Sequence, residues 1–119
     1  MYTITKQFSF SASHVLDHLP EGHPCARLHG HNYVVELVLE SSELNAHGFV
    51  RDYNELSPFK DFIDGKLDHR HLDDAIDRPS TAENLAHFLY DFAKRMWPEV
   101  VGVRVSETPK TWAEYRPGP

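Results

Sequence analysis

Two stretches with apolar residues at every second position constrain the fold of this chain more than any other feature. In positions 2 to 14 the apolar phase, interrupted only by Lys6, carries Tyr2, Ile4, Phe8, Phe10, Ala12 and His14. In positions 29 to 39 it carries His29, His31, Tyr33, Val35, Leu37 and Leu39. Because successive strand side chains point to opposite faces, each stretch predicts a strand with one buried face. Three histidines then belong to the buried faces of two neighbouring strands.

Three neutral imidazoles on neighbouring strands favour a zinc site. Zinc sites that perform chemistry commonly use three protein ligands, whereas structural sites use four and usually several cysteines. The chain has a single cysteine, Cys25, four residues before His29, so a zinc finger is excluded and a nucleophile or base stands beside the candidate metal site. The plainer alternative is that the histidines are hydrogen-bonded core residues and that Cys25 is an inert buried thiol.

Length and charge limit the class of protein. With 119 residues, the chain predicts one domain spanning 1–119, close to the size at which subunit contacts complete the core, so we expect a homo-oligomer. The net charge of −6 and the lack of a Lys/Arg-rich block argue against nucleic-acid binding. Residues 1–7 lack the organisation of a signal peptide, and no run approaches the roughly 20 apolar residues of a membrane span. The sequence therefore predicts a cytoplasmic protein without membrane association.

The remaining elements complete an α+β layer. We expect the second strand to end near Glu40, and residues 49–53 to extend briefly. A first helix is expected from Ser57-Pro58 to Gly65, and a second from the capping box Ser80-Thr81-Ala82-Glu83 to Pro98. Val101, Val103 and Val105 alternate in a third main strand with Glu107 in the same phase, and Thr111 to Tyr115 forms the fourth. The prediction is a four-stranded antiparallel sheet with two helices on one face. Glu107 is either a site residue or a solvated strand end.

Five segments, in order, resemble the landmarks of the 6-pyruvoyl-tetrahydropterin synthase superfamily. They are Ser9-Phe10-Ser11-Ala12-Ser13-His14, Cys25-Ala26-Arg27-Leu28-His29-Gly30-His31-Asn32-Tyr33, Leu67-Asp68-His69, Ser80-Thr81-Ala82-Glu83-Asn84-Leu85-Ala86 and Val105-Ser106-Glu107-Thr108. The three-residue spacer between Cys25 and His29, preceded by Pro20-Glu21-Gly22-His23, resembles the branch of the queuosine and 7-deazaguanine pathway.

The resemblance implies a role for each matching residue. His14, His29 and His31 match zinc ligands, and Cys25, Asp68 and His69 match the catalytic cysteine and the aspartate-histidine pair that assists it. Glu107 matches the glutamate that anchors the pterin. Thr108, Thr81 and Arg27 are further candidates for substrate contacts. The family's tunnelling fold joins the sheets of several subunits into a barrel, so the resemblance also implies a trimer-based homo-oligomer such as a hexamer, with active sites at subunit interfaces.

The resemblance implies a zinc-dependent carbon-carbon lyase acting on 7,8-dihydroneopterin triphosphate. In the branch indicated by the cysteine spacing, the products are 6-carboxy-5,6,7,8-tetrahydropterin, acetaldehyde and triphosphate. The alternatives are the pyruvoyl-forming reaction or a related pterin side-chain cleavage, a zinc- or pterin-binding module without turnover, and a structural subunit whose histidines are core residues.

Overall fold

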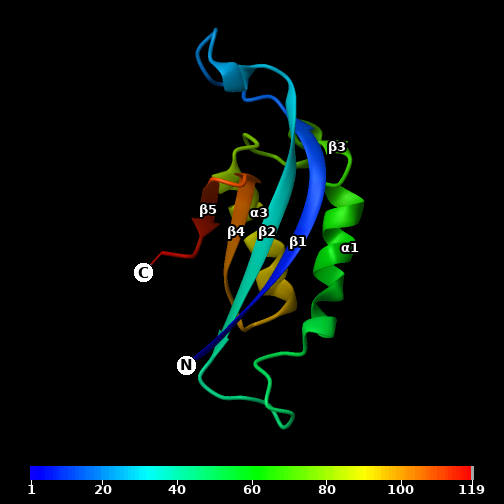
Figure 1. Cartoon of the computed structure of the whole chain (residues 1–119), viewed down its shortest axis with the longest axis vertical. Coiled ribbons are helices and arrows are strands. Elements are labelled where there is room, and N and C mark those ends of the chain that lie inside the picture. Colours follow the sequence, from blue (N-terminus) through cyan, green and yellow to red (C-terminus); the bar gives the residue numbers. More distant parts are fainter. Residues whose placement is uncertain (119) are drawn as a thin grey trace.

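A mixed five-stranded sheet forms the centre of the computed structural model, which describes residues 1–118 (Figure 1). The strands are β1 (Tyr2–His14), β2 (His29–Ser41), β3 (Arg70–His71), β4 (Val100–Thr108) and β5 (Thr111–Tyr115), in the order β3-β1-β2-β4-β5. Neighbouring pairs are antiparallel except β1 and β3, which are parallel. The four predicted antiparallel strands are confirmed, and β3 is a short fifth strand that the sequence did not indicate.

The two long strands β1 and β2 pair over their whole length, so their apolar phases share one face. Phe8 lies opposite Val35, and Phe10 lies opposite Tyr33. Tyr33, Val35, Leu37 and Leu39 are fully buried on this face. The predicted alternation is therefore confirmed, and the same register carries the histidines at the other end of the two strands.

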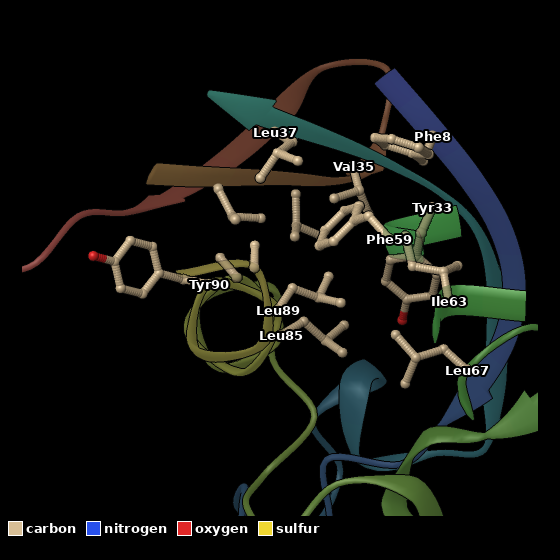
Figure 2. Close-up of a cluster of buried hydrophobic side chains, with 14 of the residues drawn as sticks. Phe8, Tyr33, Val35, Leu37, Phe59, Ile63, Leu67, Leu85, Leu89 and Tyr90 are labelled. Atoms are coloured by element: carbon tan, nitrogen blue, oxygen red, sulfur yellow. The ribbon is translucent and has the colours of Figure 1, made fainter. Parts of the chain in front are cut away.

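Two main helices cover that face. Phe59 and Ile63 of α1 (Ser57–Lys66) and Leu85 and Leu89 of α3 (Ala82–Met96) belong to one core cluster with the apolar residues of β1 and β2 (Figure 2). At about 25 cal/mol per Å² of apolar surface removed from water, this shared core is the main stabilising term of the fold. The predicted placement of both helices on one face is confirmed.

Several local boundaries differ from the prediction. Gly65 lies inside the last turn of α1, which continues to Lys66. Residues 49–53 form no strand, and a 3-10 helix, η2 (Tyr53–Leu56), follows instead, capped by the Asp52 carboxylate. A second 3-10 helix, η1 (Pro24–Ala26), and a four-residue helix, α2 (Leu72–Ala75), were also not predicted. These elements are too short to leave a periodic pattern in the sequence.

The N-cap of α3 is Thr81, one residue later than the predicted capping box required. Thr81 Oγ1 accepts a hydrogen bond from the Asn84 amide at 3.2 Å. The hydroxyl of Ser80 instead donates to Asp73, and among the described residues Glu83 makes no side-chain hydrogen bond. The predicted box was wrong because the Ser80 hydroxyl is bonded to Asp73 of α2 instead of capping α3.

Replacing Thr81 by alanine should lower the free energy of unfolding by about 1 kcal/mol, because the first turn of α3 loses its side-chain acceptor. The expected result is a lower urea midpoint with an unchanged m-value. Glu83→Gln, which removes a charge but no cap, is the matched control and should have a smaller effect. Equal midpoints for Thr81→Ala and the unmodified chain would show that Thr81 does not stabilise the helix.

The strand β4 keeps Glu107 on the core side of the sheet despite an irregularity. The register against β2 shifts between Val38 and Leu39, so Val100, Val103 and Val105 are fully buried and Val101 is only half-buried. The predicted phase therefore holds from Val103 to Glu107.

Over residues 1–118, no helix has both the length and the apolar composition needed to cross a membrane.

Candidate metal centre

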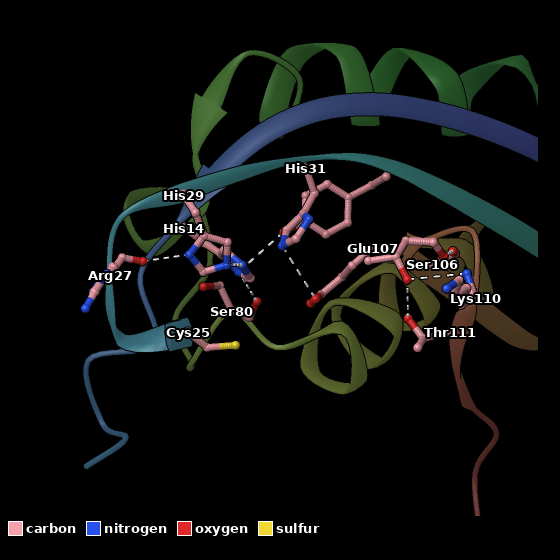
Figure 3. Close-up of polar contacts among 12 residues, drawn as sticks. His14, Cys25, Arg27, His29, His31, Ser80, Ser106, Glu107, Lys110 and Thr111 are labelled. Carbon is pink, nitrogen blue, oxygen red and sulfur yellow. Dashed lines mark hydrogen bonds and ion pairs between the residues drawn. The ribbon is translucent and has the colours of Figure 1, made fainter. Parts of the chain in front are cut away.

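Three histidines converge where β1 ends and β2 begins. The pairing places His14 opposite His29 and Ala12 opposite His31, so all three side chains leave the sheet on the core side. One imidazole nitrogen of each lies within 4.8 Å of the other two, and His14 is fully buried (Figure 3). The convergence predicted from the strand pattern is confirmed.

The hydrogen bonds of two rings fix their tautomers. His14 Nδ1 lies 2.8 Å from the Ser80 carbonyl oxygen, and His29 Nδ1 lies 2.6 Å from the Arg27 carbonyl oxygen. A carbonyl only accepts, so each Nδ1 carries the proton and donates. In the neutral rings each Nε2 then presents a lone pair, and these two atoms are 2.8 Å apart. Two lone pairs at this distance repel unless a cation lies between them, so the arrangement fits a bound metal ion.

His31 completes the cluster beside Glu107. Its Nε2 lies 3.7 Å from Glu107 Oε2. Burial lowers the pKa of His31, the Glu107 carboxylate opposes this shift, and the neighbouring His14 and His29 reinforce it. The neutral imidazole, which is the form that binds a metal, is therefore favoured. Tyr33 contacts the cluster through its hydroxyl oxygen, which lies 3.3 Å from His14 Nδ1. Burial raises the pKa of this phenol.

Cys25 lies in η1, and its backbone is anchored at both ends. Its amide donates to His23 Nδ1 at 3.1 Å, and its carbonyl accepts from the Leu16 amide at 3.0 Å, which ties the loop to the end of β1. The thiol is half-buried and lies on the same side of the sheet as the histidines (Figure 3). Across residues 1–118, no hydrogen bond holds the thiol itself.

Asp68 and His69 form a pair at the β3 edge of the sheet. Asp68 Oδ2 lies 3.0 Å from His69 Nδ1, and Asp68 Oδ1 accepts from the Ser11 amide at 3.0 Å. The Ser11 amide, with His69, lowers the pKa of Asp68. His69 has a positive φ of 57°, and its side chain is 82% exposed. Among the described residues no hydrogen bond or ion pair joins this pair to Cys25, so the predicted catalytic set stays a prediction.

An open cavity of about 460 Å³ borders both His31 and His69. Its polar lining includes Ser11, Ser13, Asn32, His69, Arg70 and His71. Because strand side chains alternate, Ser11, Ser13 and Asn32 lie on the sheet face opposite to the histidine cluster, so most of this cavity belongs to that other face.

Three weaker candidates have local contacts in the structure. Thr81 caps α3, and Thr108 Oγ1 lies 3.0 Å from Thr111 Oγ1 in the β4–β5 turn. Arg27 is exposed, and its carbonyl rather than its side chain holds His29. Their contacts with a substrate stay a prediction.

Sequence reasoning missed Ser80 and Asp73. Ser80 supplies the acceptor for His14 through its main chain, which no side-chain pattern can reveal. Asp73 lies in a helix of four residues, and its contacts with Val15 and Ser80 span long stretches of chain. The only signal for Ser80 was its place in a helix-start motif, which predicted a different role.

A small α+β chain with a three-histidine cluster that fits a metal ion is thus the class that the fold and the site define. The chain belongs to the 6-pyruvoyl tetrahydropterin synthase family, whose model matches residues 3–118. The 6-carboxy-5,6,7,8-tetrahydropterin synthase of Synechocystis is 36% identical over 124 residues, covering 97% of this chain and 93% of that protein. The 6-pyruvoyl tetrahydrobiopterin synthase of Drosophila melanogaster is 33% identical over 132 residues, covering 95% and 78%.

A solved structure shows the same fold. The 6-pyruvoyl tetrahydropterin synthase of Caenorhabditis elegans superposes with a TM-score of 0.86 at 28% identity, covering 98% of this chain and 96% of that one. The family prediction made from the five sequence landmarks is therefore confirmed.

Proposed function

We propose that the chain is a zinc-dependent lyase that converts 7,8-dihydroneopterin triphosphate to 6-carboxy-5,6,7,8-tetrahydropterin in queuosine and 7-deazaguanine biosynthesis. Acetaldehyde and triphosphate are the other products. The observation that carries the proposal is the convergence of His14, His29 and His31, with two Nδ1–H groups donated to carbonyls and the Nε2 atoms free for a metal. Membership of the family supports the pterin substrate.

Zinc is the metal that suits these ligands. Three neutral imidazoles without a cysteine ligand form a site with an open position, which is typical of catalytic zinc. A zinc ion held by the three histidines would act as a Lewis acid toward hydroxyls of the substrate side chain. Glu107 and the half-buried Cys25 stand on the same side of the sheet and delimit the space beside the cluster (Figure 3).

Proton transfer is assigned to Cys25 and His69. A thiolate at Cys25 would remove a proton from the substrate side chain, and His69 would take up or return the second proton. Asp68 accepts a proton contact from His69 Nδ1, which fixes the tautomer of the ring. The other ring nitrogen, Nε2, is then available for proton transfer, because the His69 side chain is exposed. The acid-base set explains why turnover, rather than binding alone, is proposed.

The positions of these groups support active sites at subunit interfaces. Cys25 lies beside the histidine cluster, and His69 is exposed at the β3 edge. We infer a homo-oligomer, trimer-based as in a hexamer, in which His69 of one subunit faces Cys25 of another. Joining of the sheets into a barrel belongs to the same proposal.

Glu107 is assigned to the pterin. The carboxylate is half-buried, and across residues 1–118 its oxygens accept no hydrogen bond; its nearest charged partner is His31 Nε2, 3.7 Å from Oε2. An ionised carboxylate accepts two parallel N–H donors, and the guanidine-like edge of a pterin presents two such donors side by side.

Replacing Glu107 by glutamine should lower kcat/KM about 10- to 100-fold, because one oxygen acceptor becomes a donor that opposes the pterin edge. We expect most of the loss in KM, with zinc content unchanged. Glu43→Gln, in an exposed turn, is the matched control for the charge change. If Glu107→Gln lost zinc and kept its KM, Glu107 would serve the metal site instead of the pterin.

The product branch is the finer part of the proposal. The short spacer from Cys25 to His29 and the relative in Synechocystis favour the carboxy product. The Drosophila relative is nearly as similar, so formation of 6-pyruvoyl-tetrahydropterin or a related side-chain cleavage is the second candidate.

Incubation of the zinc-loaded protein with 7,8-dihydroneopterin triphosphate tests the proposal. Triphosphate and acetaldehyde are quantified, and the pterin is identified by mass. Equal amounts of acetaldehyde and 6-carboxytetrahydropterin are expected. Triphosphate with a pyruvoyl product would assign the second branch, and bound zinc without turnover would leave a binding module.

A further inference from the structure

Asp73 connects three segments that surround the histidine cluster. Its Oδ2 accepts a hydrogen bond from the Val15 amide at 2.8 Å, and its Oδ1 accepts one from Ser80 Oγ at 3.0 Å. The same Oδ2 lies 3.2 Å from His71 Nε2. The carboxylate of α2 therefore ties together the end of β1, the strand β3 and the segment that precedes α3.

These contacts bracket His14 along the strand. Val15, the next residue, is bound directly by Asp73. Ser13, the preceding residue, is bound through His71, whose Nδ1 lies 3.0 Å from Ser13 Oγ. Both neighbours of His14 are thus connected to one carboxylate, Val15 directly through its amide and Ser13 through its hydroxyl and His71. His14, between them, is fully buried in the core.

Asp73 also holds the acceptor of the His14 ring. Ser80 is fully buried, and its carbonyl oxygen lies 2.8 Å from His14 Nδ1. A buried hydroxyl without a hydrogen-bond partner is strongly unfavourable, so the hydrogen bond from Ser80 Oγ to Asp73 fixes the position and orientation of Ser80. The carbonyl of the same residue then stays aimed at the imidazole, and His14 Nε2 stays aimed at His29.

We propose that Asp73 is a positioning residue of the metal centre: it sets the orientation of His14 through Val15, His71 and Ser80. This inference rests on the proposed metal centre. Groups that orient a ligand through hydrogen bonds typically contribute 10- to 100-fold to metal affinity. Across residues 1–118 Asp73 makes no hydrogen bond or ion pair with the three histidines of the cluster, so its effect on the metal centre acts through the neighbours of His14.

The test is the zinc affinity of the full chain, measured by competition with a chromophoric chelator on metal-free protein. Asp73→Asn should weaken zinc binding about 10- to 100-fold, because the amide presents one acceptor atom where the carboxylate presents two. Asp74→Asn is the matched control: both aspartates are exposed residues of α2, and across residues 1–118 Asp74 forms no ion pair. Its replacement should change zinc affinity less than about fivefold.

A spectroscopic readout separates positioning from general stability. With cobalt(II) in place of zinc, visible absorption reports the arrangement of the ligands, and Asp73→Asn should shift these bands while Asp74→Asn should not. Ser80→Ala, which keeps the carbonyl and removes the bond to Asp73, should weaken zinc binding in the same direction but less. If Asp73→Asn does not fold, Ser80→Ala is the variant whose zinc affinity tests the proposal.

The outcomes distinguish the two proposals. If the unmodified chain binds no zinc, both the metal centre and the role of Asp73 are wrong. If the unmodified chain binds zinc, and Asp73→Asn and Ser80→Ala bind it as tightly as Asp74→Asn, the metal centre stands and the role of Asp73 is overturned.

Discussion

A chain with His29 replaced by alanine should be purified without stoichiometric zinc and should lose turnover. The loss of zinc affinity should exceed the factor of about 100 that marks the upper range for indirect contacts, because a ligand itself is removed. His29 is the informative choice among the three histidines. It is half-buried, whereas removal of the fully buried His14 would also leave a core cavity and an unpaired Ser80 carbonyl.

Zinc content by elemental mass spectrometry and affinity by chelator competition measure the effect. His47→Ala is the matched control, because His47 lies exposed in the turn after β2. The far-ultraviolet circular dichroism of both variants should match that of the unmodified chain. Stoichiometric zinc in His29→Ala would show that the ion is held elsewhere or that His29 is only a core partner of His14.

The strands and helices that could be predicted are those whose burial repeats along the sequence. β1, β2 and α3 each present an apolar phase over 13 to 15 residues, so their type and their buried face follow from the pattern. β3 and α2 have two and four residues. They are held in place by the Ser11 contact with Asp68 and the Val15 contact with Asp73, which join residues 57 and 58 positions apart. No local pattern encodes such contacts.

The candidate site also has a part that could be predicted from the sequence and a part that could not. The convergence of His14, His29 and His31 could be predicted because it needs only the period of two strands and their pairing. The relation of His69 to Cys25 could not, because no strand pairing or hydrogen bond of the described chain joins the two residues, and the proposal places them on different subunits. The support from the Ser80 carbonyl could not either, since every residue has a carbonyl and only the fold selects the one that faces His14.

Replacing Cys25 by alanine should lower turnover by about 10²- to 10⁴-fold, the usual contribution of a positioned general base, and leave zinc bound. The fold should be unaffected, because Cys25 is held through its backbone bonds to His23 and Leu16, which alanine preserves. Release of triphosphate and of acetaldehyde should be followed separately, together with zinc content.

The comparison of Cys25→Ala with Cys25→Ser distinguishes proton transfer from space filling. Serine restores most of the volume but not an acidic thiol, so it should remain nearly as slow as alanine if the thiolate is the base. His18→Ala, an exposed change in the same loop, should keep full turnover. Unchanged turnover in Cys25→Ala would remove Cys25 from the mechanism. Loss of zinc together with turnover would instead make Cys25 part of the metal site, a role that the three converging imidazoles do not require.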